Sequence, residues 1–235
     1  MGLRIFNKRP IAWLVETVRR EGPLRPLVIM VTVIGDYWFD WRQGTDTCRR
    51  IPRLQIETDS PNKIYATGSG STKVMAFRGL MRRLRLSPAN VFLDLGSGKG
   101  RILLLAAEYG FRRIVGVEFS PLLCACARRN LEAFLRRRSS APPVEVREID
   151  VTRYDFQDDE SVLFLYDPFT PPVLNQVLEN LRASLARRPR PVWLIYHVPK
   201  ERGTLDACGL FDRPECHVIW GAEFCVYRAG PAAPA

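Results

Sequence analysis

The segment from Val91 to Arg101 limits most strongly what this chain of 235 residues can fold into. It reads VFLDLGSGKGR, which is a run of β-type residues, then a glycine-rich turn, then the start of a helical pattern. Gly96, Gly98 and Gly100 allow the backbone to turn tightly into a helix and to lie close to a ligand. The segment therefore predicts a strand–turn–helix unit with a ligand site at the turn.

Short apolar runs alternate with helical patterns from residue 87 onward. Further strands are expected over residues 114–117, 144–149, 162–166 and 192–196, and helices over 101–109, 121–138 and 172–186. A closing antiparallel hairpin is expected over residues 216–220 and 223–227. The alternation is typical of an α/β protein with a doubly wound, mostly parallel, Rossmann-like sheet. We place an N-terminal helical extension, or lid, in residues 1–86 and the core in residues 87–235. Ligands of such sheets bind at the carboxyl ends of the strands.

The residue types around the turn distinguish between two possible ligands that both contain adenosine, NAD and S-adenosylmethionine. The dinucleotide fingerprint needs a third glycine or alanine at position 101, which is Arg101 here. Asp94 would repel a pyrophosphate and attract an ammonium or sulfonium group, and S-adenosylmethionine carries both positive groups and no phosphate. Glu118, at the end of the second strand, is placed to accept hydrogen bonds from the two hydroxyls of a ribose, which NAD also has. We favour S-adenosylmethionine and keep an NAD-dependent oxidoreductase as the alternative.

From about residue 89 to residue 228 the chain resembles the class I S-adenosylmethionine-dependent methyltransferases. The resemblance rests on three motifs: Asp94-Leu95-Gly96-Ser97-Gly98-Lys99-Gly100-Arg101, Gly116-Val117-Glu118-Phe119-Ser120-Pro121 and Tyr166-Asp167-Pro168-Phe169. More narrowly, it extends to a poorly characterised bacterial group with the pattern Phe39-Asp40 through Gly44-Thr45-Asp46-Thr47. It implies a seven-stranded sheet, with Asp94 and the glycines by the methionine moiety, Glu118 on the ribose and Asp150 near the adenine. The cofactor-binding candidates are Asp94, Gly96, Ser97, Gly98, Gly100, Glu118, Phe119, Asp150 and Val151.

The methyl acceptor is expected beside the third motif. Asp167 is the first candidate for orienting or deprotonating an acceptor, and His197, directly after another strand, is the second. Amino-methylating relatives have an Asn or Asp, two prolines and an aromatic residue at this motif, whereas this chain has one proline before Phe169. The motif therefore leaves the methylated atom open. The candidate residues of the acceptor pocket are Tyr65, Thr72, Tyr166 and Phe169, and Thr72 is also placed to cap a helix over residues 74–84.

The net charge of the chain bears on the class of partner or substrate that it could bind. Thirty-five Lys and Arg residues against 25 Asp and Glu residues give a net charge of +10. This permits a nucleic-acid partner, either as the substrate of an RNA methyltransferase or as the ligand of a nucleic-acid-binding protein. We favour solvated arginine-rich helix faces and an unidentified acceptor that is a small molecule or a protein side chain. No carboxylate–histidine cluster indicates a catalytic metal.

Four further patterns concern the compartment and the N-terminal third. The six cysteines have neither C-x-x-C nor zinc-finger spacing, and without a secretory pattern we expect reduced thiols in a cytoplasmic protein. The apolar run over residues 27–34 is too short for a transmembrane span, which needs about 20 residues. A basic and apolar stretch over residues 4–18 would suit an anionic membrane surface, but we do not favour peripheral contact because such stripes usually pack on their own domain. Trp38, Phe39 and Trp41 are expected to pack as an aromatic core.

Overall fold

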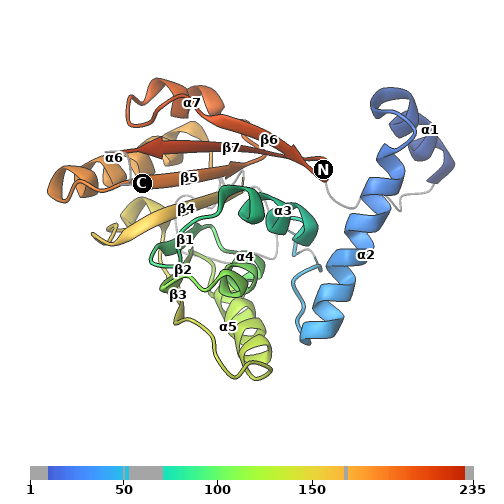
Figure 1. Ribbon diagram of the computed structural model, residues 1–235, viewed down its shortest axis with the longest axis horizontal. Helices are drawn as coiled ribbons and strands as arrows, with labels where there is room; N and C mark the ends of the chain where they lie inside the picture. The colour runs from blue at the N-terminus through green and yellow to red at the C-terminus, as the bar shows by residue number, and fades with distance from the viewer. Residues whose placement is uncertain (1–9, 50, 53–70, 167–168, 231–235) are drawn as a thin grey trace.

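The computed structural model describes residues 10–49, 51–52, 71–166 and 169–230, and the centre of the fold is a seven-stranded sheet (Figure 1). The strand order is β3-β2-β1-β4-β5-β7-β6, with β7 antiparallel to both of its neighbours and the other pairs parallel. This order confirms the expected doubly wound sheet with a terminal hairpin. The strands are β1 (Val91–Leu95), β2 (Arg113–Glu118), β3 (Val144–Glu148), β4 (Glu160–Tyr166), β5 (Val192–His197), β6 (Glu215–Ile219) and β7 (Ala222–Ala229).

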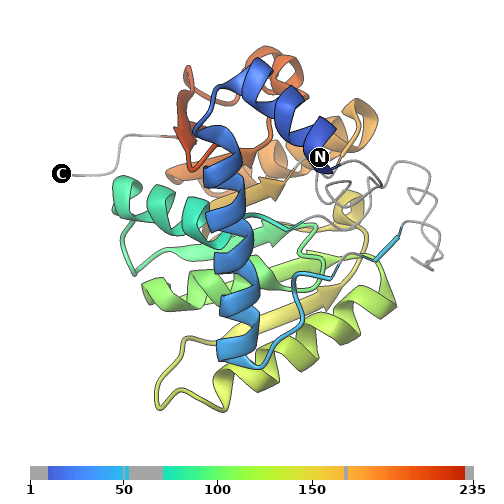
Figure 2. The same ribbon diagram turned by 90° about the vertical axis from the view of Figure 1, so that its right-hand side faces the viewer.

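Helices cover both faces of the sheet (Figures 1 and 2). One apolar core lies between the sheet and α3, α4 and α5, and a second lies between the sheet and α6 and α7. The helices are α1 (Pro10–Glu21), α2 (Arg25–Gln43), α3 (Val74–Leu84), α4 (Arg101–Ala106), α5 (Pro121–Leu135), α6 (Pro171–Arg187) and α7 (Arg202–Ala207), with single 3₁₀ turns η3 (Ala107–Tyr109) and η4 (Val151–Arg153). No helix in these described ranges is long and apolar enough to cross a membrane.

The register of the central strands gathers their carboxyl ends at one edge. All five residues of β1 are buried, as expected of a strand covered on both faces. Leu95, its last residue, pairs with Val117 on β2 and with Leu165 on β4. The loops that follow these three strands therefore begin side by side, and the glycine turn leaves from the middle one.

The helix α3 belongs to the apolar core, although it precedes the first strand. Phe77 lies edge-on to Phe92 of β1, with ring centroids 6.2 Å apart, and to Phe164 of β4, at 5.7 Å. The first N–H of α3, on Val74, donates to Asp36 of α2 over 2.9 Å, and the N-cap residue is Lys73. The expectation that Thr72 caps this helix is therefore wrong, because a carboxylate from another helix takes that place.

The helix α2 runs along the outside of α3 and α5 (Figure 2), and it turns its polar side inward. Its buried residues are Thr32, Asp36, Phe39, Asp40 and Gln43. Of the aromatic cluster expected to form a core, Phe39 is buried, but Trp38 is 49% exposed and Trp41 is 79% exposed. The expectation is wrong for these two tryptophans because the helical period places them opposite Asp36 and Asp40, which are held inward by ion pairs to the core.

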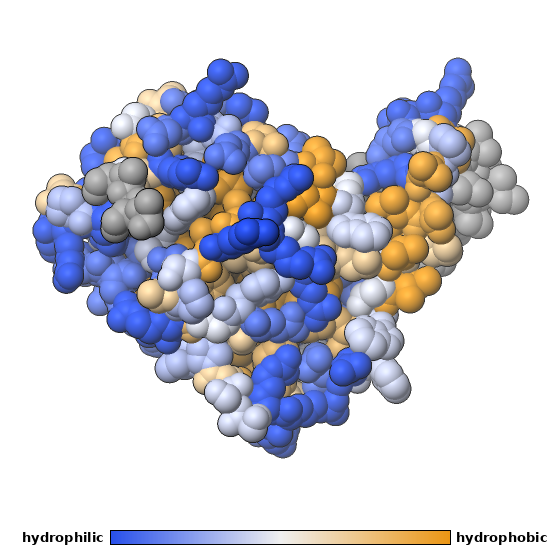
Figure 3. Space-filling view, in the orientation of Figure 1, coloured by the Kyte–Doolittle hydropathy of each residue, from blue (hydrophilic) through white to orange (hydrophobic). Residues whose placement is uncertain are grey.

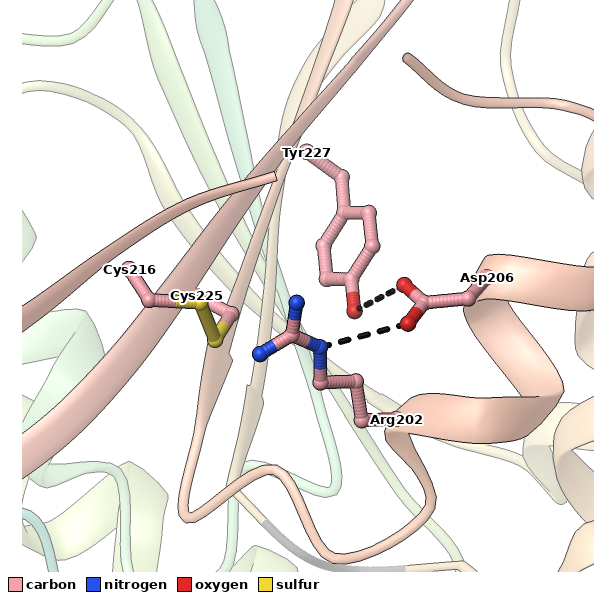
Figure 4. The surroundings of a disulfide bond; sticks show 5 residues. All are labelled: Arg202, Asp206, Cys216, Cys225 and Tyr227. Atoms are coloured by element: carbon pink, nitrogen blue, oxygen red, sulfur yellow. Dashed lines mark hydrogen bonds and ion pairs between the residues drawn. A yellow bond between two sulfur atoms is a disulfide. The ribbon is translucent and has the colours of Figure 1, made fainter. Parts of the chain in front are cut away.

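The hairpin at the sheet edge contains a disulfide bond between Cys216 and Cys225 (Figure 4). The two residues are directly opposite in the β6–β7 register. The expectation of six reduced thiols is therefore wrong for this pair, while Cys48, Cys124, Cys126 and Cys208 are free. Beside the disulfide, Tyr227 donates to Asp206, which also pairs with Arg202 across one turn of α7 (Figure 4).

Candidate active site

The glycine turn is built from backbone hydrogen bonds that leave room for a ligand. The N–H groups of Gly96 and Ser97 both donate to the carbonyl of Val117, over 2.8 and 2.9 Å, and tie the turn to the end of β2. Gly98 and Gly100 have positive φ angles of 54° and 83°, which an L side chain rarely adopts. Among the described residues, no heavy atom lies within 4 Å of the position of a Cβ on Gly98. The turn is therefore open on the side of Gly98.

Two carboxylates lie beneath this turn, Asp94 on β1 and Glu118 at the end of β2. Both are almost completely buried, and Gly98 and Ser120 donate their N–H groups to Glu118 over 2.9 and 3.0 Å. Burial, reinforced by the charge of Glu118, raises the pKa of Asp94 well above its usual range. Burial also raises the pKa of Glu118, although backbone hydrogen bonds oppose it. An anionic pair is costly here unless a donor from outside joins it.

Three buried oxygen atoms at this edge have no hydrogen-bond partner within the described structure. They are Oδ2 of Asp94, Oγ of Ser97 and Oγ1 of Thr170. Buried polar atoms in native proteins are nearly always paired, so an unpaired set beside an open turn indicates a bound group. An unpaired carboxylate oxygen accepts from a donor, and an ammonium is the donor that also neutralises its charge. The site fits a cationic nucleoside ligand and repels a pyrophosphate.

The expected adenine contacts lie at the next strand ends. Asp150 accepts from the N–H and hydroxyl of Thr152, over 2.9 and 2.7 Å, and begins the η4 turn. Val151 is buried in the core on the α6 side, and Phe119, after β2, is half-buried. The structure therefore places these residues at the same sheet edge as Glu118, with Asp150 also used as a turn cap.

Two of the expected acceptor residues meet directly. Thr72 Oγ1 lies 2.9 Å from Nδ1 of His197, and both side chains are buried. The His197 ring is stacked between Tyr166, with ring centroids 4.4 Å apart, and Phe224, at 4.6 Å. Burial lowers the pKa of His197 to about 3, so the ring is neutral near pH 7. This stack forms an aromatic wall at the ends of β4 and β5.

The other acceptor candidates are Phe169, Asp167 and Tyr65. Phe169 packs on the α6 side of the sheet. Asp167 and Tyr65 lie outside the described residues. Sequence reasoning missed Phe224 as a member of this wall. Its position opposite His197, in the hairpin that follows β5, could have indicated it.

A buried charge network joins the glycine turn to α2, and sequence reasoning missed it. Arg101, the first residue of α4, is 3% exposed and lies 3.3 Å from Asp36 and 3.5 Å from Asp40. Its guanidinium also donates to Oγ1 of Thr47 over 2.7 Å and to the carbonyl of Thr72 over 3.4 Å. Arg101 therefore connects the cofactor side of the site to the residue that holds His197. The signal in the sequence was a charged residue at the start of an otherwise apolar helix.

Comparisons with known proteins agree with this geometry. Residues 61–170 match the family described as histone methylation protein DOT1. A ribosomal protein L11 methyltransferase of Thermus thermophilus is 35% identical over 118 residues, which is 50% of this chain and 41% of that protein. The structure of an RNA methyltransferase from Salinibacter ruber with S-adenosyl-L-homocysteine is 25% identical, covers 71% of this chain and 97% of that chain, and has a TM-score of 0.50. The chain is thus similar in sequence and in fold to S-adenosylmethionine-dependent methyltransferases.

A further relative of this chain is the adenine nucleotide translocase lysine N-methyltransferase of Mus musculus. It is 31% identical over 155 residues, which is 62% of this chain and 59% of that protein. The chain thus spans only 41% and 59% of these two curated relatives. The oxidoreductase alternative receives no support from these comparisons, because all of these similar proteins are methyltransferases.

Proposed function

We propose that this protein transfers a methyl group from S-adenosylmethionine to an amino group of a protein side chain. The observation that carries the cofactor half of the proposal is the buried, unpaired Oδ2 of Asp94 under an open glycine turn. Asp94 and Ser97 would hold the amino-acid end of the cofactor, and Glu118 the ribose hydroxyls. The bound sulfonium supplies an already activated methyl group. The protein therefore has to align the acceptor, exclude water and take up a proton.

The acceptor side supplies alignment and water exclusion. In the wall of Tyr166, His197 and Phe224, His197 and Phe224 are buried and Tyr166 is half-buried, and Thr72 engages Nδ1 of His197. With a pKa of about 3, His197 is a poor base near pH 7, so we assign it to the wall. Asp167 remains our candidate for accepting the proton or orienting the acceptor.

A protein acceptor is supported by what the relatives are named for. The matched family concerns a histone, and the curated relatives act on a ribosomal protein and on a lysine of a translocase. RNA is the second candidate, because the Salinibacter ruber relative is an RNA methyltransferase that this chain covers almost completely. The excess of arginines would also suit an RNA.

Calorimetry with S-adenosylhomocysteine tests the cofactor half. Asp94→Asn removes a charge-assisted hydrogen bond and should weaken binding by about 1.5–3 kcal/mol, or roughly 10- to 150-fold. The matched control is Glu145→Gln, an exposed carboxylate on β3, which should leave binding unchanged. Equal binding to the wild type and Asp94→Asn, or tight binding of NAD without binding of S-adenosylhomocysteine, would overturn the proposal.

A transfer assay with methyl-labelled cofactor tests the acceptor half. The full-length enzyme is incubated with a bacterial lysate, and the labelled product is treated with protease or with ribonuclease. We expect label that is released by protease and resists ribonuclease, on an amine that amino-acid analysis identifies. Label released by ribonuclease would replace the protein acceptor with RNA and leave the cofactor assignment intact.

A further inference from the structure

The helix α2 has its polar and apolar sides reversed relative to a normal surface helix. Its buried side carries two aspartates, a threonine and a glutamine together with Phe39. The opposite side, which we call the outer face of α2, is apolar and exposed, and consists of Leu27, Met30, Ile34, Tyr37, Trp38 and Trp41. A surface helix ordinarily places its apolar stripe on the core. The reversal indicates that the outer face meets something other than water.

The outer face is one continuous stripe rather than scattered residues. Apart from the adjacent Tyr37 and Trp38, its members follow one another at intervals of three or four residues, so they lie along one side of the helix from Leu27 to Trp41. Figure 3 shows apolar side chains running along α2. Exposure is 53% for Met30, 60% for Ile34 and 79% for Trp41. A contiguous apolar surface of this kind marks a contact with a partner or a membrane.

The charges around the stripe are mainly basic, because the nearby acids Glu16 and Glu21 are paired with Arg20 and Arg25. The two acidic side chains of α2, Asp36 and Asp40, are buried and paired with Lys73 and Arg101. At the ends of the helix are Arg19, Arg42 and Arg137. Within the described part of the chain, these three arginines have no carboxylate at ion-pair distance, and Arg137 donates to the carbonyl of Arg42. The outer face is therefore apolar in the middle, with an excess of positive charge at both ends.

This charge pattern argues against a second copy of the same chain as the occupant. Parallel or antiparallel pairing of two outer faces would bring basic ends together, and like charges at close range repel. An anionic lipid surface complements both ends at once, because its phosphate groups accept hydrogen bonds from guanidinium groups. Tyrosine and tryptophan, which make up half of the stripe, are the residues that favour the headgroup region of a bilayer.

We propose that the outer face of α2 docks this protein on an anionic phospholipid surface. The helix would lie in the plane of the membrane, with Ile34 and Trp41 among the acyl chains and the arginines at the headgroups. The sequence alone favoured packing of the N-terminal basic stretch on its own domain. The exposed outer face of the adjoining helix is the reason to revise that view. The inference is independent of the identity of the methyl acceptor.

Vesicle co-sedimentation with the full-length protein tests this docking. We compare vesicles of phosphatidylcholine with vesicles of equimolar phosphatidylcholine and phosphatidylglycerol. Wild-type protein should bind the second kind at least tenfold more tightly, with binding that weakens as salt is added. Trp41→Ser should reduce binding about tenfold, and Arg42→Gln combined with Arg137→Gln should do the same for the anionic vesicles alone.

Val218→Ser is the matched control, because this side chain is 74% exposed but lies on the edge strand β6. It should bind anionic vesicles like the wild type. Circular dichroism establishes that each variant is folded, which is expected since the altered side chains are exposed. Failure of the wild type to bind anionic vesicles, or equal binding of the wild type and Trp41→Ser, would overturn the proposal. A stable dimer in light scattering that Trp41→Ser converts to monomers would also overturn it, in favour of a second copy.

Discussion

Replacement of Arg101 by methionine tests whether the buried charge network holds the N-terminal segment on the core. The methionine keeps much of the aliphatic stem but removes the charge that Asp36 and Asp40 face at 3.3 and 3.5 Å. It also removes the hydrogen bonds to Thr47 and to the carbonyl of Thr72. Removing one partner of a buried ion pair costs about 3–5 kcal/mol, because it leaves an uncompensated charge.

Asp36 and Asp40 keep other partners in this variant, so the loss of free energy of unfolding should lie at the low end of that range. Asp36 keeps Lys73 and the N–H of Val74. Burial raises the pKa of Asp40, but hydrogen bonds from residues 45, 47 and 48 and the charge of Arg101 outweigh it and hold the pKa below its ordinary value. Most of those hydrogen bonds survive in the variant. We therefore expect the free energy of unfolding to fall by about 3 kcal/mol.

Urea denaturation followed by circular dichroism measures this loss. The matched control is Arg112→Met, which removes an exposed guanidinium paired with Asp159 and should cost less than about 1 kcal/mol. A further expectation is weaker acceptor turnover, because Arg101 contacts the residue that holds His197. If Arg101→Met is no less stable than Arg112→Met, the network does not hold α2, and the reasoning is refuted.

Three other changes give separate expectations. Gly116→Ala would place a Cβ 2.6 Å from Cδ1 of Leu103, and this overpacking should cost about 1–3 kcal/mol in urea denaturation and displace the glycine turn. Because the pKa values of Asp94 and Glu118 are raised, the cofactor-free protein should lose stability as pH rises from about 4 through those pKa values. Binding of S-adenosylhomocysteine, which requires the ionised forms, should strengthen over the same range. Cys216→Ser opens a loop with a sequence separation of 9 and should lower stability by about 2–3 kcal/mol.

Each of these expectations has a control. Gly203→Ala adds a methyl group where no described atom lies within 4 Å, so it should not destabilise, and equal effects at both glycines would contradict the overpacking argument. Asp94→Asn should flatten the pH dependence of the melting temperature. An unchanged profile would mean that groups other than Asp94 cause the pH dependence. Thiol titration of the unfolded, unreduced protein should find four free cysteines, and six would show that the disulfide is absent.

The cofactor side of the fold was predictable because it depends on local sequence and on strand order. The glycine turn, Asp94 and Glu118 each follow or end a recognisable strand, and parallel strands bring their carboxyl ends to one edge. The disulfide could also have been predicted by counting residues along the C-terminal hairpin. Residues 216 and 225 lie at equal distances from a hairpin turn that the sequence already indicated.

The acceptor wall and the orientation of α2 were not predictable in this way. Phe224 reaches His197 through an antiparallel strand that returns from the end of the chain. The apolar pattern of α2 would have turned its tryptophans inward, whereas the tertiary contacts of Asp36 and Asp40, those with Arg101 and Lys73 above all, make the polar side the buried one. A buried charge is stable only with its partner, and the partner lies more than 60 residues away in the sequence.

The polar attachment of α2 has a calorimetric consequence. Exposure of apolar surface raises the heat capacity of a protein, whereas exposure of polar surface lowers it. Detachment of α2 from the core would uncover Phe39 together with Asp36, Asp40 and Gln43, so the two contributions oppose each other. Such an opening would add almost nothing to the heat-capacity change of unfolding. Amide hydrogen exchange along α2, rather than scanning calorimetry, is the measurement that detects it.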